Sequence, residues 1–321
     1  MRSKCHETQG AMMGIRKLLP ATTFEVFPLC LGGNVFGWSA DETQSFAVLD
    51  AFYEEGGNFI DTADVYSEWK EGNTGGDSET IIGKWMAARG NRHVLIIATK
   101  VAKYSKRKGL SPTNIKAAAD DSLRRLQTDY IDLYYAHEDD ESVAQEDVIA
   151  TFDGLAKAGK IKAAGASNFT GARLRSAAVI SAKNNLIAFT ALQNHYNIME
   201  RSEFEKDAGI AARELGIDSI PFFGLARGFL TGKYKPGVTV ESVRAGGVAP
   251  YLNDRGWSIL SEIEKIASNY GVSPSAVALA WLRAKNQTPI ASARTVSQLH
   301  EIMQIVQLSP DEISVLDNVS N

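Results

Sequence analysis

Short apolar runs alternate with stretches of helical periodicity along most of this chain. Two of the clearest runs, at 94–99 and 131–136, end at polar residues, Lys100 and His137. Strands that alternate with helices are typical of parallel sheets, and eight such units favour a closed (β/α)8 TIM barrel. An open doubly wound sheet is the alternative. The expected strands cover 29–33, 58–61, 94–99, 131–136, 161–166, 190–192, 218–222 and 288–291.

The alternation predicts one domain. We expect residues 15–321 to form a single barrel with long loops at its C-terminal face, and residues 1–14 to be a flexible lead-in. A length of 321 residues fits the usual size of this fold. The glycine-rich segment 67–77 and the segment 224–254 are the expected long loops, and the second is long enough to act as a flap.

Composition narrows the classes of protein. A hydrophobic content of 44% excludes a disordered chain, and a net charge of −4 argues against a nucleic-acid partner. No apolar run approaches the ~20 residues of a membrane span, and residues 1–20 contain no signal-peptide core. Two cysteines, Cys5 and Cys30, indicate neither a disulfide framework nor a zinc site. We therefore expect a soluble, cytoplasmic protein without a metal.

Polar residues follow the expected strands where a barrel places its active site. Asp61, Tyr66, Lys100 and His137 follow three consecutive strands and are expected to converge on one rim. Each of these residues alone is weak evidence. A lone lysine after a strand is more often solvated or paired, and a lone histidine or tyrosine is more often part of the packing. Their combination, with these residue types at the ends of three consecutive strands, favours a shared functional site.

This combination resembles the aldo-keto reductase superfamily, in its bacterial branch with an extended first loop. The matching segments span nearly the whole chain and together are highly specific, although none would be alone. They are 56–66, Ser78-Glu79 with Ile82-Gly83, 99–101, 129–134 with His137, 165–169, Gln193 with Tyr196-Asn197, and 225–234.

The resemblance implies NAD(P)H-dependent reduction of an aldehyde or ketone, including sugar-type carbonyls, with Asp61, Tyr66, Lys100 and His137 as the catalytic tetrad. Tyr66 would donate the proton, because hydride transfer to a carbonyl carbon leaves negative charge on the oxygen. The Lys100 ammonium would make the phenol more acidic, and Asp61 would hold and balance Lys100. His137 would hydrogen-bond the carbonyl oxygen and orient the substrate.

The resemblance also assigns a cofactor site, with NADPH/NADP+ expected and NADH as the alternative. Ser167, Asn168 and Gln193 would hold the nicotinamide carboxamide, and Phe222 would stack on the nicotinamide ring unless it is ordinary barrel core. The other expected contacts are Leu225, Arg227, Ser292, Arg294, Gln298 and Glu301.

The adenosine end of the expected cofactor site departs from the family's pattern. Ser292 and Arg294 are the expected readers of the 2′-phosphate, because a guanidinium suits the forked geometry of phosphate. Related sequences often carry Gly and Asn where this chain has Ser292 and Ile302, which weakens the assignment. No Gly-x-Gly-x-x-Gly segment follows the first strand, which argues against a Rossmann fold.

The substrate is the least constrained part of the prediction. Phe36, Trp38 and Trp69 either form an apolar wall beside Tyr66 or only pack, and Arg227 meets either a cofactor phosphate or an anionic substrate. Two other functions stay open: a dehydrogenase of sugar or pyridoxal-type alcohols, and a non-catalytic regulatory subunit that retains the cofactor site. The expected assembly is a monomer or a small homo-oligomer.

Overall fold

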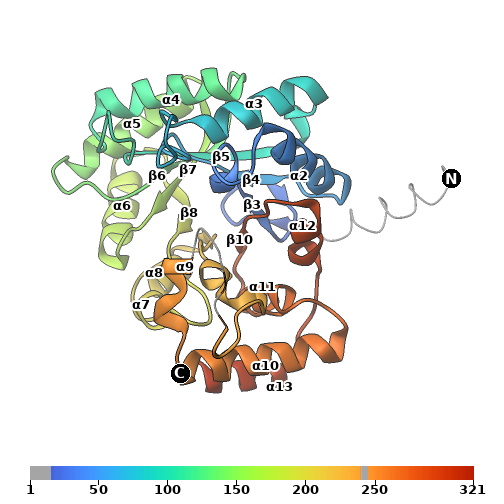
Figure 1. Cartoon of the computed structure of the whole chain (residues 1–321). Helices are drawn as coiled ribbons and strands as arrows, with labels where there is room; N and C mark the ends of the chain where they lie inside the picture. The colour runs from blue at the N-terminus through green and yellow to red at the C-terminus, as the bar shows by residue number, and fades with distance from the viewer. Residues whose placement is uncertain (1–15, 239, 241–244) are drawn as a thin grey trace.

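A computed structural model describes residues 16–238, 240 and 245–321, so the expected lead-in at 1–14 lies outside the described residues. Within them, eight parallel strands form one curved sheet in the order β10-β3-β4-β5-β6-β7-β8-β9 (Figure 1). The strands are β3 (Cys30–Gly32), β4 (Phe59–Asp61), β5 (Ile96–Val101), β6 (Ile131–Ala136), β7 (Ile161–Ser167), β8 (Phe189–Gln193), β9 (Asp218–Ser219) and β10 (Ile290–Ala291).

The sheet closes on itself. The N–H of Thr288 donates to the carbonyl of Ser219 at 3.0 Å, and the N–H of Ile290 donates to the carbonyl of Pro221 at 3.0 Å. These bonds join the last strand to the segment that continues β9. The structure is therefore a (β/α)8 barrel, as the alternation of strands and helices predicts, and the open doubly wound alternative is wrong.

Helices surround the barrel, and several of them begin at a residue whose side chain caps the helix. Asp41 and Gln44 form a reciprocal capping box at the start of α2, and Ser111 caps α4 ahead of Pro112. The surrounding helices are α2 (Glu42–Glu54), α3 (Asp77–Arg89), α4 (Pro112–Leu126), α5 (Gln145–Lys157), α6 (Gly171–Asn184), α7 (Ser202–Lys206), α8 (Ala208–Leu215), α11 (Pro274–Ala284) and α12 (Val296–Met303).

Several elements depart from the periodicity. The helical stretch after β8 is interrupted at Asp207, between α7 and α8, and the Asp207 carboxylate accepts a hydrogen bond from the N–H of Gly171 at the start of α6. Short turns of 3₁₀ helix follow or precede strands, at η2 (Gly33–Val35) and η3 (Arg92–Val94). The expected loop 224–254 contains η4 (Ala226–Thr231), α9 (Ala245–Val248) and η5 (Ala249–Tyr251). Outside the barrel, α10 (Asp254–Tyr270) and α13 (Pro310–Val319) lie side by side (Figure 1).

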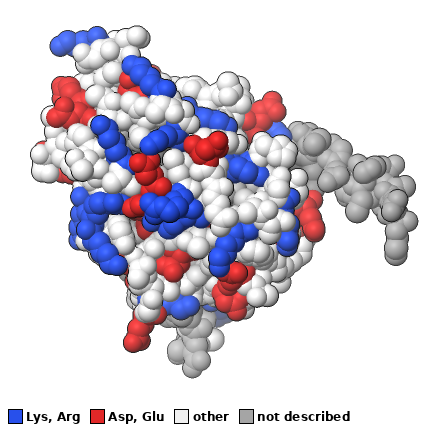
Figure 2. All heavy atoms as spheres, turned by 90° about the horizontal axis from the view of Figure 1, so that it is seen from above, with Lys and Arg blue, Asp and Glu red and all other residues white. Residues whose placement is uncertain are grey.

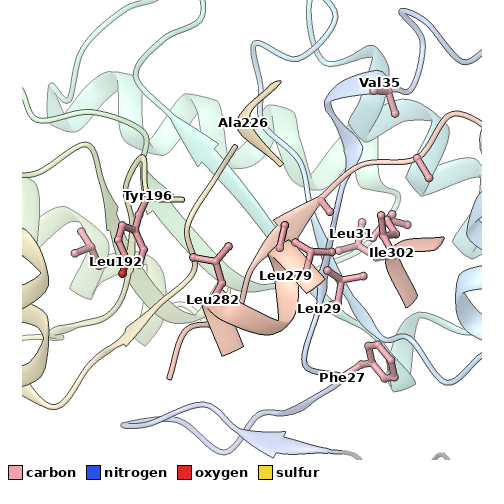
Figure 3. Packing of buried hydrophobic residues seen from close by; sticks show 14 of the residues in the cluster. Phe27, Leu29, Leu31, Val35, Leu192, Tyr196, Ala226, Leu279, Leu282 and Ile302 are labelled. Atoms are coloured by element: carbon pink, nitrogen blue, oxygen red, sulfur yellow. The ribbon is translucent and has the colours of Figure 1, made fainter. Parts of the chain in front are cut away.

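The hydrophobic core has two layers. One layer lies between the barrel and its helices, where Leu279 of α11 and Ile302 of α12 meet Leu29 and Leu31 of the first strand segment (Figure 3). The other layer fills the barrel interior. It contains Cys30, Phe59, Ala98, Leu133, Tyr135, Ala163, Ala191, Ile220 and Ile290.

A hairpin of β1 (Lys17–Leu18) and β2 (Glu25–Val26) covers the amino-terminal end of the barrel. Leu19, Phe24 and Val26 pack into the interior layer, and the Lys17 ammonium donates to Asp218 at 2.9 Å. Asp218 begins β9, so the ion pair fixes the hairpin to the end of the barrel opposite to the expected active site.

The outer face formed by α3, α4 and α5 carries lysine and arginine interspersed with aspartate and glutamate (Figure 2). Ion pairs such as Arg124–Asp121 and Lys157–Asp153 account for part of this pattern. No helix within the described residues is both long and apolar enough to cross a bilayer.

Candidate active site

A cavity of about 740 Å³ opens at the carboxyl ends of the strands. Asp61, His137, Ser167 and Gln193, which lie at or just after the ends of β4, β6, β7 and β8, form part of its wall. This is the end of a (β/α)8 barrel at which active sites are found, and the volume lies within the usual range of ligand cavities. No group of His, Cys, Asp and Glu suited to a metal ion occurs in the described part of the chain.

Lys100 is the centre of the polar groups beneath this cavity. Its ammonium donates to Asp61 Oδ2 at 2.7 Å, to the carbonyl of Thr62 at 2.7 Å and to the phenol oxygen of Tyr66 at 2.8 Å. Burial lowers the pKa of Lys100, while the charge of Asp61 opposes that shift. Three acceptors match the three protons of an ammonium, so the geometry suits the charged form.

Tyr66 lies in a turn after β4 and points back over the strand ends. Its hydroxyl donates to Asp61 Oδ2 at 3.2 Å while accepting from Lys100. Burial, followed by the charge of Asp61, raises the pKa of Tyr66 well above its usual value. The phenol is therefore protonated at neutral pH, and the tendency of Lys100 to acidify it acts against these two effects.

His137 follows β6 and faces the ring of Tyr66, with the two ring centres 6.1 Å apart. Burial, followed by the charges of Lys100 and Lys103, lowers the pKa of His137 well below its usual value. The imidazole is therefore neutral at pH 7. Its ring lines the cavity, and its Nδ1 atom is buried without a hydrogen-bond partner among the described residues.

Gln193 has a contact that the sequence does not indicate. Its amide nitrogen donates to Asp61 Oδ1 at 2.8 Å, so the two carboxylate oxygens of Asp61 are held by different partners. Gln193 was expected to hold a nicotinamide carboxamide. It lines the cavity, but in this structure its amide also fixes the orientation of Asp61.

Ser167 and Asn168 lie side by side at the end of β7 and line the cavity. Asn168 has a left-handed backbone with φ of 58°, which asparagine tolerates better than most residues. Its side-chain amide donates to the carbonyl of His137 at 2.8 Å and to the Ser167 hydroxyl at 3.0 Å. These bonds link the expected carboxamide site to the loop that holds His137.

A second buried charge cluster lies beneath the turn of Tyr66. Burial, followed by the charge of Glu79, raises the pKa of Asp64 to about 8. Glu79 is also buried and accepts a hydrogen bond from Arg125 Nε at 2.6 Å. The Arg125 guanidinium therefore bonds to Glu79 and also opposes the rise in the pKa of Asp64. Asp64 is mostly protonated at neutral pH.

The segment after β9 forms the wall opposite the tetrad. Phe222, Leu225 and Arg227 all line the cavity, as the expected cofactor contacts require. The ring of Phe222 stacks on His195 with an angle of 13° between the planes, so one face of Phe222 is supported from behind. Arg227 has a left-handed φ of 58° and its guanidinium lies 4.2 Å from the centre of the Phe223 ring.

Ser292, Arg294, Gln298 and Glu301 line the part of the cavity next to β10, which we call the adenosine end after the sequence-based expectation. The Ser292 hydroxyl donates to Asn34 Oδ1 at 2.6 Å, and the Arg294 N–H donates to Gln298 Oε1 at 3.0 Å.

The same end includes a close approach of two strand ends. A Cβ on Gly32 would lie 2.6 Å from Ser292 Oγ, so only glycine at position 32 lets the ends of β3 and β10 approach this closely. Ser292 takes the place of the smaller Gly that related sequences often carry, and Gly32 provides the room for its hydroxyl.

Two tryptophans stand beside Tyr66. Trp69 is 50% exposed, lines the cavity, and packs edge-on against both Tyr66 and Trp38. Trp38 supports Trp69 but is not part of the cavity wall. Phe36 is fully buried in the hydrophobic core and is not part of the wall either, so its position suits packing rather than substrate contact.

Sequence reasoning missed the cavity residues Asn34, Lys103 and Lys233. It also missed His195, which lies behind Phe222 outside the cavity wall. Lys233 lies within a segment that resembles the family, and Asn34 directly follows Gly32-Gly33 at the end of the first strand. The sequence context of these two residues could therefore have identified them as candidate site residues. Lys103 follows Lys100 in an ordinary polar loop, where nothing in the sequence distinguishes it from a solvated lysine.

A (β/α)8 barrel with a phenol held by a buried ammonium at one end of a long, cation-lined cleft has the architecture of an oxidoreductase that acts on small molecules. The model for the family described as "Aldo/keto reductase family" matches residues 28–321. The chain therefore belongs to the aldo-keto reductase family.

Relatives from bacteria and fungi align along most of their length. The uncharacterized oxidoreductase YrpG of Bacillus subtilis is 32% identical, over 92% of this chain and 91% of that protein. Norsolorinic acid reductase B of Aspergillus parasiticus is 30% identical, over 94% of this chain and 83% of that protein. A putative aryl-alcohol dehydrogenase of Saccharomyces cerevisiae is 31% identical, over 95% of this chain and 86% of that protein.

Proposed function

We propose that this protein is an NADPH-dependent reductase that converts an aldehyde or ketone to the alcohol. The observation that carries the proposal is the 2.8 Å contact between the Lys100 ammonium and the Tyr66 phenol, with Asp61 bonded to both. A protonated phenol at the edge of a cavity is suited to give its proton to a carbonyl oxygen as charge develops there.

The residues around the cavity fit a nicotinamide dinucleotide. The amides of Asn168 and Gln193, which line the cavity, suit the carboxamide, and one face of Phe222 suits the ring. Arg227, Lys233 and Arg294 supply positive charge along the rest of the cleft, where phosphates would lie. When bound, such a cofactor supplies the hydride.

The proton step is assigned to Tyr66, and the two residues on either side of it have separate tasks. The neutral imidazole of His137 holds the carbonyl oxygen near the phenol, because the ring lines the cavity beside Tyr66. Lys100 stabilises the phenolate that remains after the proton has left. In the oxidative direction the same phenolate would accept the proton.

Arg294 supports the preference for NADPH over NADH. It lines the adenosine end of the cleft and forms no ion pair with a carboxylate in the described part of the chain. A guanidinium in that position suits the 2′-phosphate that distinguishes the two cofactors.

Trp69 and Trp38 support aromatic carbonyl compounds as the substrate class. The half-exposed indole of Trp69 offers an apolar face next to the candidate proton donor, and an aryl ring would cover it. The names of two relatives, a norsolorinic acid reductase and a putative aryl-alcohol dehydrogenase, agree with this choice.

The test is a screen of carbonyl compounds with the purified chain and each reduced cofactor, following the loss of NAD(P)H absorbance. We expect aryl aldehydes to be reduced faster than aliphatic aldehydes of similar size, and NADPH to be used in preference to NADH. Absence of turnover with every aldehyde and both cofactors, in a protein that is folded by circular dichroism, would reject the proposal.

A further inference from the structure

The positive charge that lines the cavity exceeds what the proposed cofactor uses. The cationic side chains in the wall are Lys103, Arg227, Lys233 and Arg294. Arg227, Lys233 and Arg294 belong to the segments after β9 and β10, on the side with the expected cofactor residues. Lys103 alone of these four follows β5, next to the tetrad, so its charge has no role in the proposed cofactor site.

Lys103 lies close to the reacting end of the cavity. It is two residues beyond the end of β5, the strand that carries Lys100, and it shares the wall with Tyr66 and His137. Its charge is one of the influences that lower the pKa of His137. An anionic group bound by Lys103 would therefore belong to a molecule that also reaches the imidazole.

The ion pair that Lys103 forms in this structure is easily replaced. Its ammonium lies 3.4 Å from Glu138 Oε2, and both side chains are exposed, Lys103 by 36% and Glu138 by 45%. Long, exposed ion pairs of this kind contribute little stability, because solvent screens both charges. Glu138 is not part of the cavity wall, so a ligand anion would approach Lys103 from a different side.

Trp69 also lines the cavity, and its loop contacts that of Lys103, because the N–H of Ser105 donates to Glu68 Oε2 at 3.3 Å. Its half-exposed ring and the ammonium of Lys103 together offer one apolar surface and one positive charge around the candidate proton donor. A flat aromatic ring that carries a carboxylate complements both, because the ring covers the indole and the carboxylate accepts from the ammonium.

We propose that Lys103 is an anion-binding residue of the substrate site, and that the preferred substrates are aryl aldehydes or ketones with a carboxylate on the ring. This inference rests on the proposed carbonyl reductase function and specifies its substrate class. It predicts that the protein distinguishes carbonyl substrates by their charge as well as by their shape.

The test compares 4-carboxybenzaldehyde with methyl 4-formylbenzoate, a neutral ester of similar shape. For the wild type we expect kcat/KM to be about tenfold higher for the carboxylate, mainly through KM, the size of one well-placed charge-assisted contact. Lys103→Met keeps the length of the side chain but removes its charge, and should bring the ratio between the two substrates close to one.

Two further variants make the comparison specific to the site. Lys106→Met removes the same charge from an exposed position of the same loop, outside the cavity wall, and should keep the tenfold ratio. Glu138→Gln removes the competing carboxylate and should increase the ratio. A ratio that Lys103→Met leaves unchanged, or an equal loss with both substrates, would overturn the proposal.

Binding separates this proposal from the reductase function. Quenching of tryptophan fluorescence by 4-carboxybenzaldehyde in the presence of NADP+ reports occupancy beside Trp69 without turnover. Weaker binding in Lys103→Met than in Lys106→Met supports the anion site even if no aldehyde is reduced. Equal binding by these two variants rejects the site, whatever the turnover shows.

Discussion

The two ends of the cleft are built differently. At the tetrad end, Lys100 and Asp61 are fully buried and bonded to each other and to fixed neighbours on strands. At the adenosine end, Ser292 and Arg294 are partly exposed, and the hydroxyl of Ser292 and the backbone N–H of Arg294 bond to neighbouring side chains. Groups at the tetrad end are in position before any ligand arrives, whereas those at the adenosine end exchange local partners for a ligand.

This difference predicts that mutations at the two ends of the cleft have different effects. Changes at the tetrad end should alter the chemical step and the stability of the fold, because buried charges have no alternative partners. Changes at the adenosine end should alter only the affinity for the cofactor, because solvent replaces a lost contact there.

The largest expected effect is that of Tyr66→Phe. Loss of the proton donor should lower kcat by about 10³-fold, within the usual range for general acid catalysis. The dissociation constant of NADPH, measured by fluorescence titration, should stay within about twofold. Tyr104→Phe, which removes a phenol outside the cavity wall, is the matched control. Turnover of Tyr66→Phe equal to that of the control would contradict the role of Tyr66.

Lys100→Met should affect both activity and folding. It leaves the carboxylate of Asp61 buried without its ammonium, which costs about 3–5 kcal/mol in comparable cases. Urea unfolding measures the loss, and the double variant Asp61→Asn with Lys100→Met should regain part of it. Lys84→Met, which breaks an exposed pair with Glu42, should cost less than about 1 kcal/mol. Equal losses for Lys84→Met and Lys100→Met would remove the distinction between a buried and a solvated charge.

Asp64 gives the tetrad end a measurable pH dependence. Its pKa is raised from 3.8 to about 8, so between these values the folded chain binds a proton that the unfolded chain has released. The contribution of this group to the free energy of unfolding therefore falls by about 1.4 kcal/mol per pH unit as pH rises from 4 to 8, and is constant above 8.

Asp64→Asn removes that proton equilibrium while keeping the shape. Relative to the wild type, the variant should become steadily more stable from pH 5 to pH 8 in urea unfolding. Asp311→Asn, on the exposed surface of α13, should show no such trend. Parallel pH profiles for Asp64→Asn and the wild type would show that Asp64 is ionised throughout this range.

The smallest expected effect is that of Arg294→Ala, at the adenosine end. The dissociation constant of NADPH should rise about tenfold, the size of one charge-assisted hydrogen bond, and that of NADH should change little. Lys265→Ala, on the surface of α10, controls for the loss of one positive charge. Equal weakening of both cofactors would show that Arg294 does not read the 2′-phosphate.

The barrel and the position of the candidate site were predictable from the sequence. The carboxyl ends of parallel strands meet at one end of the barrel, so the polar residues that follow the strands lie on one rim regardless of the loop conformations. Asp61, Lys100 and Tyr66 are in hydrogen-bond contact although 39 residues separate the first two in the chain. Strand period and parallel pairing were sufficient for that prediction.

Other features were not predictable, each for a physical reason. The bond from Gln193 to Asp61 crosses 132 residues and depends on side-chain direction, which periodicity does not specify. Phe36 belongs to the core because the chain turns inward after β3. The hairpin β1–β2 has strands of two residues each, too short to show an alternating pattern. α13 and α10 carry ordinary amphipathic helix patterns that do not say whether they belong to the barrel.

The hairpin β1–β2 affects the route by which protons can reach the candidate site. Leu19, Phe24 and Val26 pack into the interior layer and cover the amino-terminal end of the barrel. In the proposed mechanism we therefore expect protons to return to Tyr66 through the cavity at the carboxyl ends of the strands. A bound cofactor and carbonyl compound would block this cavity. We therefore expect Tyr66 to regain its proton between rounds of reaction, after the alcohol has left.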